Sequence, residues 1–325
     1  MKKILANIKK AVKNAKTALI VSHIDPDGDS IGSMLAMGNI LTQFNLTTFY
    51  YSEDGLPKVY RFLPGADKVV NKLPPFQRYD LLFTMDASDI KRLGSKLSVK
   101  EIAKIIINID HHPDNTKYGN FNYIEKCSST AELVFKIAKH WDIKINRETA
   151  ENLYIALITD TGNFRYENTS AKTFTMAAEL LKTGIDTHEI STRIYDTRSI
   201  ASIRIQAAAL VNVEISPDRK AAWTVVTEAM MQKHQARGED LMGLVDQIRS
   251  IEGIEVAMLF REEKSKVKVN FRSKNKVNVS ALAKRFGGGG HIRAAGAVML
   301  GSIDNVKNDI VAEVLKYLKA SKYLA

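Results

Sequence analysis

Residues 17–44 read TALIVSHIDPDGDSIGSMLAMGNILTQF, and this stretch decides the fold. Its first seven residues are mostly apolar and predict a strand, and the pattern over 29–44 predicts a helix. Further strands are predicted at 47–51, 80–86 and 104–110, and further helices at 129–141, 147–159 and 171–182. Continuous apolar strands that alternate with helices are typical of a parallel sheet covered on both faces. We therefore expect an α/β first domain whose ligands bind at the carboxyl ends of the strands.

The second half of the chain changes character after a helical, Arg-rich segment over 187–209 that contains no Gly or Pro. Strands are predicted near 210–215, 221–227, 255–261 and 266–272, and helices near 228–250 and 303–319. We expect three parts, namely a first domain over 1–190, a connecting helix or linker over 191–209, and a smaller α/β domain over 210–325.

The composition is that of an ordinary soluble protein, with 45% hydrophobic and 26% charged residues and a net charge of +11. The sequence shows no apolar run of roughly 18 residues and no secretory signal, so we expect a cytoplasmic protein without membrane contact. Cys127 is the only cysteine, which excludes an intramolecular disulfide. Nine Lys and Arg residues lie between 264 and 293 without an acidic residue, which indicates a solvated basic surface or a polyanionic partner.

Histidine and aspartate residues gather at the points where four apolar segments end. These residues are His23, Asp25, Asp27 and Asp29 after the first strand, Asp86, then Asp110, His111 and His112, and finally Asp160. Each cluster alone is also explained by a turn, a helix cap or a surface loop. In a parallel sheet the clusters converge, and so many carboxylates in one place favour divalent cations. Two such cations clamp a phosphoryl group and lower the pKa of water, so we expect metal-driven phosphate hydrolysis.

A second polar region, FRSKNKVNVSALAKRFGGGGHIRAAGA, occupies residues 271–297. The N–H groups of glycines can cradle an anion, and Arg272 can pair with a phosphate through two hydrogen bonds. Four glycines in a row are equally typical of a flexible joint. Together with the metals expected in the first half, the region indicates a binding site for a phosphate-containing substrate.

The motifs HIDPDGDSIGS, MDASD, DHH, TDTGNFR, FRS and GGGGHIRAAG, in this order, resemble the DHH phosphoesterase superfamily with a DHH-associated C-terminal domain. The resemblance covers nearly the whole chain and implies a Rossmann-like catalytic domain followed by a substrate-binding domain. It implies that His23 and Asp27 hold one metal ion. It also implies that Asp29, His111 and Asp160 hold another, and that Asp86 bridges the two.

The same resemblance assigns roles around the substrate. His112 is implied to face the scissile phosphate, with Asp110 supporting the histidines. The implied substrate-binding residues are Arg272, Ser273, Gly288, Gly289, Gly290 and His291. The implied cofactors are two divalent cations, foremost Mn²⁺, with Mg²⁺ or Co²⁺ as alternatives.

Within the superfamily the chain is most similar to bacterial bifunctional oligoribonucleases and pAp phosphatases. The resemblance implies a 3′–5′ exoribonuclease that cuts RNA of a few nucleotides to nucleoside 5′-monophosphates, with single-stranded DNA as a further substrate. It also implies conversion of pAp (3′-phosphoadenosine 5′-phosphate) to AMP, and a homodimer. Two alternatives stay open: a soluble phosphodiesterase for cyclic di-AMP or pApA, and a non-catalytic protein that binds nucleotides or RNA.

Overall fold

The computed structural model describes residues 2–73 and 78–320 of the chain. The chain divides into two compact units, of which the first ends at Asp196 and the second begins at Thr197. The first unit contains a six-stranded sheet in the order β3-β2-β1-β4-β5-β6, and every neighbouring pair is parallel. The strands are β1 Thr17–Val21, β2 Thr47–Tyr51, β3 Val69–Val70, β4 Tyr79–Met85, β5 Ala103–Asp110 and β6 Phe121–Ile124.

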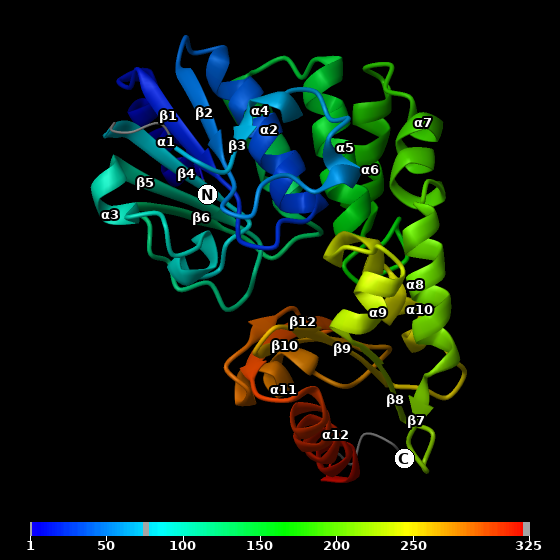
Figure 1. Cartoon of the computed structure of the whole chain (residues 1–325). Helices are drawn as coiled ribbons and strands as arrows, with labels where there is room; N and C mark the ends of the chain where they lie inside the picture. Colours follow the sequence, from blue (N-terminus) through cyan, green and yellow to red (C-terminus); the bar gives the residue numbers. More distant parts are fainter. Residues whose placement is uncertain (1, 74–77, 321–325) are drawn as a thin grey trace. The chain divides into compact units, whose positions relative to one another are not determined.

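Both faces of this sheet are covered. Ala18 and Ile20 of β1 belong to a core formed with α1, α2, α4, α5 and α6, whereas Leu19 and Val21 pack on the other face near α3 and the short helix η3. Figure 1 shows α2, α4, α5 and α6 together on one side of the sheet. These helices are α1 Lys2–Lys13, α2 Gly28–Thr42, η3 Ile90–Leu93, α3 Val99–Ile102, α4 Thr130–Trp141, α5 Arg147–Asp160 and α6 Ala171–Leu181.

The strand order places the polar clusters. β2 and β3 lie on one side of β1, whereas β4, β5 and β6 lie on the other, so the direction of winding reverses between β1 and β4. Ligands of doubly wound sheets bind at the carboxyl ends of the strands where this reversal occurs. The His and Asp clusters follow β1, β4 and β5 and therefore lie at this position.

Close packing of two helices fixes the backbone near the first cluster. A Cβ atom on Gly32 of α2 would collide with the backbone carbonyl of Asn152 in α5 and would lie 2.9 Å from the Ala156 side chain. Glycine at this position therefore lets the two helices approach each other. The contact holds the start of α2, which carries Asp29, against the end of α5, which carries Asp160.

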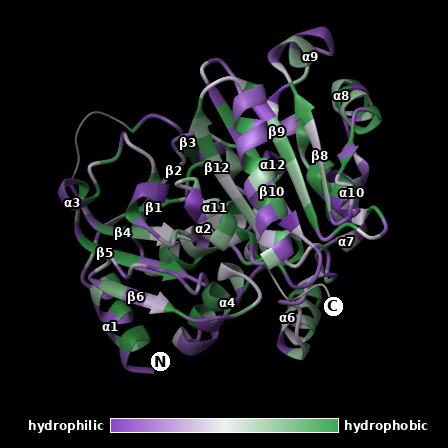
Figure 2. Cartoon of the chain, turned by 90° about the horizontal axis from the view of Figure 1, so that it is seen from below, coloured by the Kyte–Doolittle hydropathy of each residue, from purple (hydrophilic) through white to green (hydrophobic). Residues whose placement is uncertain are grey.

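The second unit contains a mixed six-stranded sheet in the order β11-β12-β10-β9-β8-β7, in which only β8 and β9 are parallel. One face packs on α11 and α12, and part of the other face packs on α8, α10 and the short helix η5 (Figures 1 and 2). The elements are α8 Ile200–Val211, β7 Glu214–Ile215, β8 Ala221–Val226, α9 Glu228–Lys233, η5 Gly238–Leu241, α10 Leu244–Ser250, β9 Val256–Glu263, β10 Lys266–Ser273, α11 Val279–Arg285, β11 Gly289–Gly290, β12 Ala294–Leu300 and α12 Ile303–Ala320. Every helix within residues 2–73 and 78–320 is too short or too polar to cross a membrane.

The connection between the units differs from the expected single helix. α7 (Thr187–Ser191) continues as a π-helical turn to Asp196, and a new helix, α8, begins at Ile200. The Ser199 hydroxyl accepts a hydrogen bond from the backbone N–H of Ser202, so Ser199 caps the N-terminus of α8. The strand predicted near 210–215 is wrong in its first part, because α8 runs to Val211 and only residues 214–215 pair in the sheet.

Candidate active site

The loop after β1 places His23 and Asp27 at the start of α2. His23 is buried, and its Nδ1 lies 2.7 Å from the Ile24 carbonyl oxygen. Nδ1 therefore carries the proton, and Nε2 is turned toward Asp27 Oδ1 at 3.7 Å and Asp86 Oδ2 at 3.4 Å. Asp27 is also the N-cap of α2, since its Oδ1 accepts a hydrogen bond from the Ser30 N–H at 3.0 Å. Helix capping thus holds the carboxylate beside the histidine.

Asp86 lies at the centre of the cluster. It follows β4 directly and has a φ of +58°, a left-handed conformation that Asp tolerates better than most residues. Its N–H donates to the Ile109 carbonyl at 3.0 Å and so continues the ladder with β5. Its two carboxylate oxygens face different histidines, with Oδ2 3.4 Å from His23 Nε2 and Oδ1 3.4 Å from His111 Nε2. This geometry suits a carboxylate that bridges two ions.

A second group of side chains surrounds His111. The His111 Nδ1 lies 3.2 Å from the Cys127 carbonyl oxygen, so Nε2 points toward the carboxylates. Nε2 is 3.7 Å from Asp29 Oδ2 and 3.6 Å from Asp160 Oδ2, and Asp160 is the last residue of α5. The structure thus brings together His23, Asp27 and Asp86 on one side and Asp29, His111 and Asp160 on the other, with ligand atoms in each group within 4.8 Å of one another.

Hydrogen bonds from the protein hold the carboxylates in place. The N-terminus of α4 points at Asp29, because the N–H groups of Thr130 and Ala131 donate to its two oxygens at 2.7 and 3.1 Å. The Thr130 hydroxyl donates to Asp86 Oδ1 at 3.0 Å, and the Asn168 side chain donates to Asp160 Oδ2 at 3.2 Å. Sequence reasoning missed Thr130 and Asn168. The Ser-Ser-Thr run before α4 predicts only a helix start, so the sequence contains no separate signal for these contacts.

The buried carboxylates of this cluster favour positive charge beside them, and they raise the pKa of His23 and of His111 to about 10 although burial opposes this. Burial raises the pKa of Asp29 well above its usual value, and the negative charges of Asp86 and Asp160 raise it further. Burial likewise raises the pKa of Asp160 to about 7, against the opposing effect of His111. Asp29 and Asp160 therefore bind protons more readily than ordinary aspartates unless cations take the place of those protons.

The distances also fit cations. The His–Asp separations of 3.4 to 3.7 Å are too long for good hydrogen bonds. They suit ligand atoms that surround an ion at about 2.0 to 2.2 Å from each. The mixture of imidazole and carboxylate donors suits divalent metal ions.

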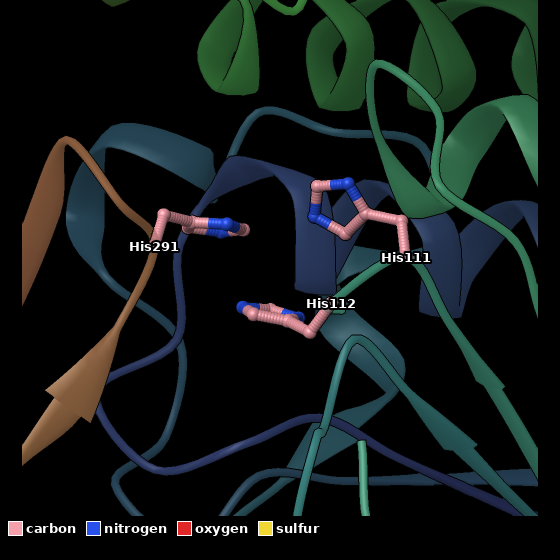
Figure 3. A group of neighbouring side chains, drawn as sticks. All are labelled: His111, His112 and His291. Atoms are coloured by element: carbon pink, nitrogen blue, oxygen red, sulfur yellow. The ribbon is translucent and has the colours of Figure 1, made fainter. Parts of the chain in front are cut away.

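Asp110 and His112 form a connected pair beside the cluster. His112 Nδ1 lies 2.7 Å from Asp110 Oδ1, and the Asn115 side chain donates to Asp110 Oδ2 at 2.6 Å. Burial lowers the pKa of His112, but Asp110 outweighs this effect and the pKa is raised. The rings of His111 and His112 are 5.0 Å apart between centroids and inclined by 69°. Both side chains are labelled in Figure 3. Asp110 and Asn115 thus fix the ring of His112.

Residues 28–32, Gly-Asp-Ser-Ile-Gly, have the spacing of the nucleophile elbow found in serine hydrolases. The structure excludes that role for Ser30. Its side chain is fully buried within α2, and its hydroxyl exchanges hydrogen bonds with the backbone of Asp27 as part of a capping box. The serine therefore stabilises the start of the helix.

The residues expected to bind substrate lie in the second unit. Arg272 extends from β10, with Nε 3.5 Å from Asp246 Oδ1. Ser273 is buried and donates its hydroxyl proton to the Val277 carbonyl at 2.7 Å, so it supports the loop after β10. His291, labelled in Figure 3, follows β11.

The glycine run has a clear structural cause. A Cβ on Gly288 would collide with the Gly296 carbonyl of β12, and a Cβ on Gly290, whose φ is +136°, would lie 2.6 Å from the Ala294 carbonyl oxygen. A Cβ on Gly289 would meet nothing within 4 Å among the described residues. Gly288 and Gly290 therefore let β11 pair with β12, whereas Gly289 has space in front of it.

Two family models match the chain. Residues 17–157 match the N-terminal domain of the DHH family, and residues 222–320 match the DHHA1 domain. The chain thus combines a DHH domain with a DHHA1 domain. Phosphoesterases of this family use divalent metals, and the His and Asp cluster after β1, β4 and β5 lies within the first matched domain.

Relatives of this DHH protein are similar over almost its whole length. The "Bifunctional oligoribonuclease and PAP phosphatase NrnA" of Thermus thermophilus is 29% identical over 99% of this chain and 96% of its own. The Bacillus subtilis protein of the same name is 28% identical over 86% of this chain and 88% of its own. A solved structure of an exopolyphosphatase-related protein from Bacteroides fragilis has a TM-score of 0.89, with 26% identity over 98% of both chains. RecJ of Thermus thermophilus in complex with Mn²⁺ is 14% identical with a TM-score of 0.53 over 97% of this chain and 54% of its own, which shows the fold alone.

Proposed function

We propose that this DHH protein hydrolyses short RNA to nucleoside 5′-monophosphates and converts pAp to AMP. The observation that carries the proposal is the pair of ligand groups that share Asp86, because one carboxylate between two His–Asp groups suits a two-ion phosphoesterase. The names of the relatives that match nearly the full length support the choice of substrate.

We assign His23, Asp27 and Asp86 to one ion, and Asp29, His111, Asp160 and again Asp86 to the other. We favour Mn²⁺ for both positions, with Mg²⁺ or Co²⁺ as substitutes, because imidazole and carboxylate ligands occur together. When bound, the ions lower the pKa of water and withdraw charge from the phosphoryl oxygens.

The other side chains would orient the substrate. Asp110 accepts a hydrogen bond from Nδ1 of His112. This hydrogen bond would turn the opposite edge of the His112 ring toward the scissile phosphate. In the second unit, Arg272, His291 and the N–H groups of Gly288–Gly290 would hold the terminal nucleotide. Ser273 would act through the loop after β10, since its hydroxyl proton already goes to Val277.

The direct test is purified protein with Mn²⁺ and four labelled substrates: a dinucleotide, a 20-nucleotide RNA, pAp and pApA. We expect release of mononucleotides from the dinucleotide and of phosphate from pAp, with slow cleavage of the long RNA. The Asp86→Asn variant, which keeps the size of the side chain, should be inactive on all of them. Turnover of pApA alone would instead support the phosphodiesterase alternative.

Absence of hydrolysis with every divalent ion, together with unchanged nucleotide binding in chelator, would support the non-catalytic alternative and refute the proposal. We also propose a cytoplasmic homodimer, and light scattering after gel filtration tests its mass. A monomer at micromolar concentration would contradict this part without affecting the chemistry.

A further inference from the structure

The outer side of α1, in the first unit, carries only positive charge. Residues 2–16 include six lysines and no acidic residue. One of them, Lys9, is partly buried and donates to the Trp141 carbonyl oxygen at 2.9 Å. The exposed lysines of the helix, which we call the basic face of α1, are Lys2, Lys3, Lys10 and Lys13.

The protein itself does not neutralise the basic face. In the part of the chain that the structure describes, no carboxylate pairs with any of these four lysines. The carboxylate at the end of this segment, Asp80, accepts hydrogen bonds from the backbone N–H groups of Lys16 and Thr17. Asp80 is also ion-paired with Lys104 at 2.7 Å. The charges of the basic face are therefore directed at the solvent.

Helix stability does not account for this charge pattern. The N-terminal end of a helix is partially positive, so Lys2 and Lys3 in the first turn are unfavourable there. Lys10 and Lys13 suit the last turn, but Lys13 lies three residues from Lys10 and four from Lys9, a spacing at which like charges repel. By contrast, α12 mixes three lysines with three acidic residues. The lysines of α1 thus indicate a purpose outside the helix.

α1 does not have the structure of a helix that inserts into a membrane surface. Its apolar side, with Leu5, Ile8 and Val12, is buried in the core of the first unit. Between the lysines its exposed side offers only Ala6 and Asn7. A helix that lies in a lipid interface needs exposed apolar side chains opposite its lysines. Protein partners likewise favour surfaces with exposed aromatic and apolar residues at their centre. Polar, positively charged surfaces are instead typical of nucleic-acid interfaces.

The basic face is remote from the candidate active site. Trp141 ends α4 and donates its indole N–H to the Leu5 carbonyl of α1 at 3.1 Å. Thr130 begins the same helix and donates to Asp86. The 12 residues of α4 place these two contacts about 17 Å apart, because a helix rises about 1.5 Å per residue. α1 also lies beside β6, as Figure 2 shows. A dinucleotide in the active site therefore does not reach the basic face.

We propose that the basic face of α1 is a second RNA-binding surface, separate from the site of hydrolysis, which holds the phosphate backbone of longer RNA. Binding at this surface keeps the protein beside longer RNA, from which cleavage releases short fragments. The proposal does not depend on which substrate the first unit hydrolyses.

The side chains of the basic face predict how this RNA is bound. Lysine presents a compact charge on a flexible stem, so it contacts phosphates without a fixed geometry. The exposed side of α1 has no aromatic residue for stacking on a base and no Arg for paired hydrogen bonds. Binding should therefore be independent of base sequence and should weaken as salt is added, because counterions are released from the phosphates.

The test replaces three of the lysines, in the Lys3→Gln/Lys10→Gln/Lys13→Gln variant. Gln has nearly the helix propensity of Lys, so α1 should stay folded. Fluorescence anisotropy with a labelled 20-nucleotide RNA in EDTA measures binding without hydrolysis, and excess pAp competes for the candidate active site. The variant should bind this RNA roughly eightfold more weakly, since each exposed ion pair contributes a factor of about two.

The dependence on salt and a charge-conserving variant identify the contacts as electrostatic. Each phosphate contact with a single strand adds roughly 0.7 to the slope of log affinity against log salt concentration, so loss of three contacts should lower the slope by about 2. Lys3→Arg/Lys10→Arg/Lys13→Arg keeps the charge and should bind as the wild type does. An unchanged affinity of the Gln variant, or an equal loss in the Arg variant, would overturn the inference.

A matched control tests whether the position of the charge matters. Lys172→Gln/Lys316→Gln/Lys319→Gln removes three exposed lysines from α6 and α12 and changes the net charge by the same amount. It should bind the 20-nucleotide RNA as the wild type does. A loss equal to that of the α1 variant would show that only the net charge matters, and the inference would fail.

Activity measurements keep the inference distinct from the proposed function. The α1 Gln variant should keep the wild-type kcat and KM for pAp and the dinucleotide, and a large loss of either would place the lysines in the catalytic machinery and overturn the inference. If the wild type hydrolyses neither substrate, the proposed function fails, whereas lysine-dependent RNA binding in EDTA still supports the second surface.

A lipid surface is the alternative that shares the chemistry of phosphate groups. Sedimentation with phosphatidylglycerol vesicles at physiological salt tests it, and the wild type should stay in the supernatant. Lysine-dependent binding to these vesicles without lysine-dependent binding to the 20-nucleotide RNA would overturn the inference in favour of a membrane.

Discussion

Replacement of Thr130 by Val tests whether the N-terminus of α4 holds the metal centre. The Thr130 hydroxyl donates to Asp86, the carboxylate that we assign to both ions, and its N–H donates to Asp29. Val has nearly the same shape and keeps the N–H, so the substitution removes only the contact with Asp86. Because Thr130 is fully buried, water cannot easily replace the hydroxyl.

The magnitude follows from the hydrogen bond that is lost. A hydrogen bond to a charged group contributes about 1.5 to 3 kcal/mol, and the lower end applies where ions share the charge of the carboxylate. About 1.5 kcal/mol corresponds to roughly a tenfold weaker affinity for metal. Loss of a hydrogen-bonding partner of a metal ligand commonly weakens binding by roughly ten- to 100-fold. We therefore expect a loss of at least about tenfold.

The assay is calorimetric titration of the metal-free protein with Mn²⁺, followed by kcat and KM for the dinucleotide. Thr130→Ser keeps the hydroxyl and should bind Mn²⁺ within about threefold of the wild type. Thr224→Val is a matched control, because Thr224 is buried in the second unit and donates to the Ala209 carbonyl at 2.6 Å. A Thr130→Val protein with wild-type Mn²⁺ affinity and kcat would refute the reasoning, as would an equal loss of affinity in Thr224→Val.

Three further predictions concern stability. Gly32→Ala should lower the free energy of unfolding by about 1 to 3 kcal/mol in urea titrations, because the added methyl group meets the Asn152 carbonyl; a neutral effect would contradict the packing of α2 on α5. Glu255 accepts hydrogen bonds from the N–H groups of residues 275–277, which keep its pKa below the usual value although burial opposes this. Its stabilising effect is therefore present above pH of about 4.3 and is lost as the pH falls through the lower folded pKa. Urea titrations should show Glu255→Gln less stable than the wild type at pH 7, with a difference in unfolding free energy that shrinks as the pH is lowered below about 4.3. EDTA should lower the Tm, since an ion at 100 times its Kd stabilises by about 2.7 kcal/mol, and Asp86→Asn should abolish the difference between Mn²⁺ and EDTA.

The sequence predicted the long elements of the first unit well because their signals are strong. Strands at residues 47–51, 79–85 and 103–110 are continuous apolar runs, and α4 and α5 have clear helical periods. β12 was missed, since its Ala-Ala-Gly start has little strand propensity and is held by pairing with β10 and β11. Residues 210 and 211, predicted as the start of a strand, instead form the C-terminal end of α8. The packing of Ile205 and Ala209 in the core stabilises the helix there.

The site could be predicted only in part from the chain. The His and Asp clusters stand out because charged residues directly follow buried strands, and their convergence is a consequence of parallel strand order. The hydrogen bonds from Thr130 to Asp86 and from Asn168 to Asp160 could not be predicted. Both donors lie in or next to loops whose sequences have no distinctive pattern. The role of Ser273 in its own loop likewise depends on Val277, which only the folded chain brings near.

The order in which the candidate ligands occur has a consequence for protein synthesis. The candidate ligands follow β1, β4 and β5, and the last of them is Asp160 at the end of α5. About half of the 325-residue chain must therefore leave the ribosome before all candidate ligands are present. The residues around 272–291 are made later still. A nascent chain emerges among ribosomal RNA and messenger RNA. The order of these residues in the chain delays completion of the proposed active site until translation is almost finished.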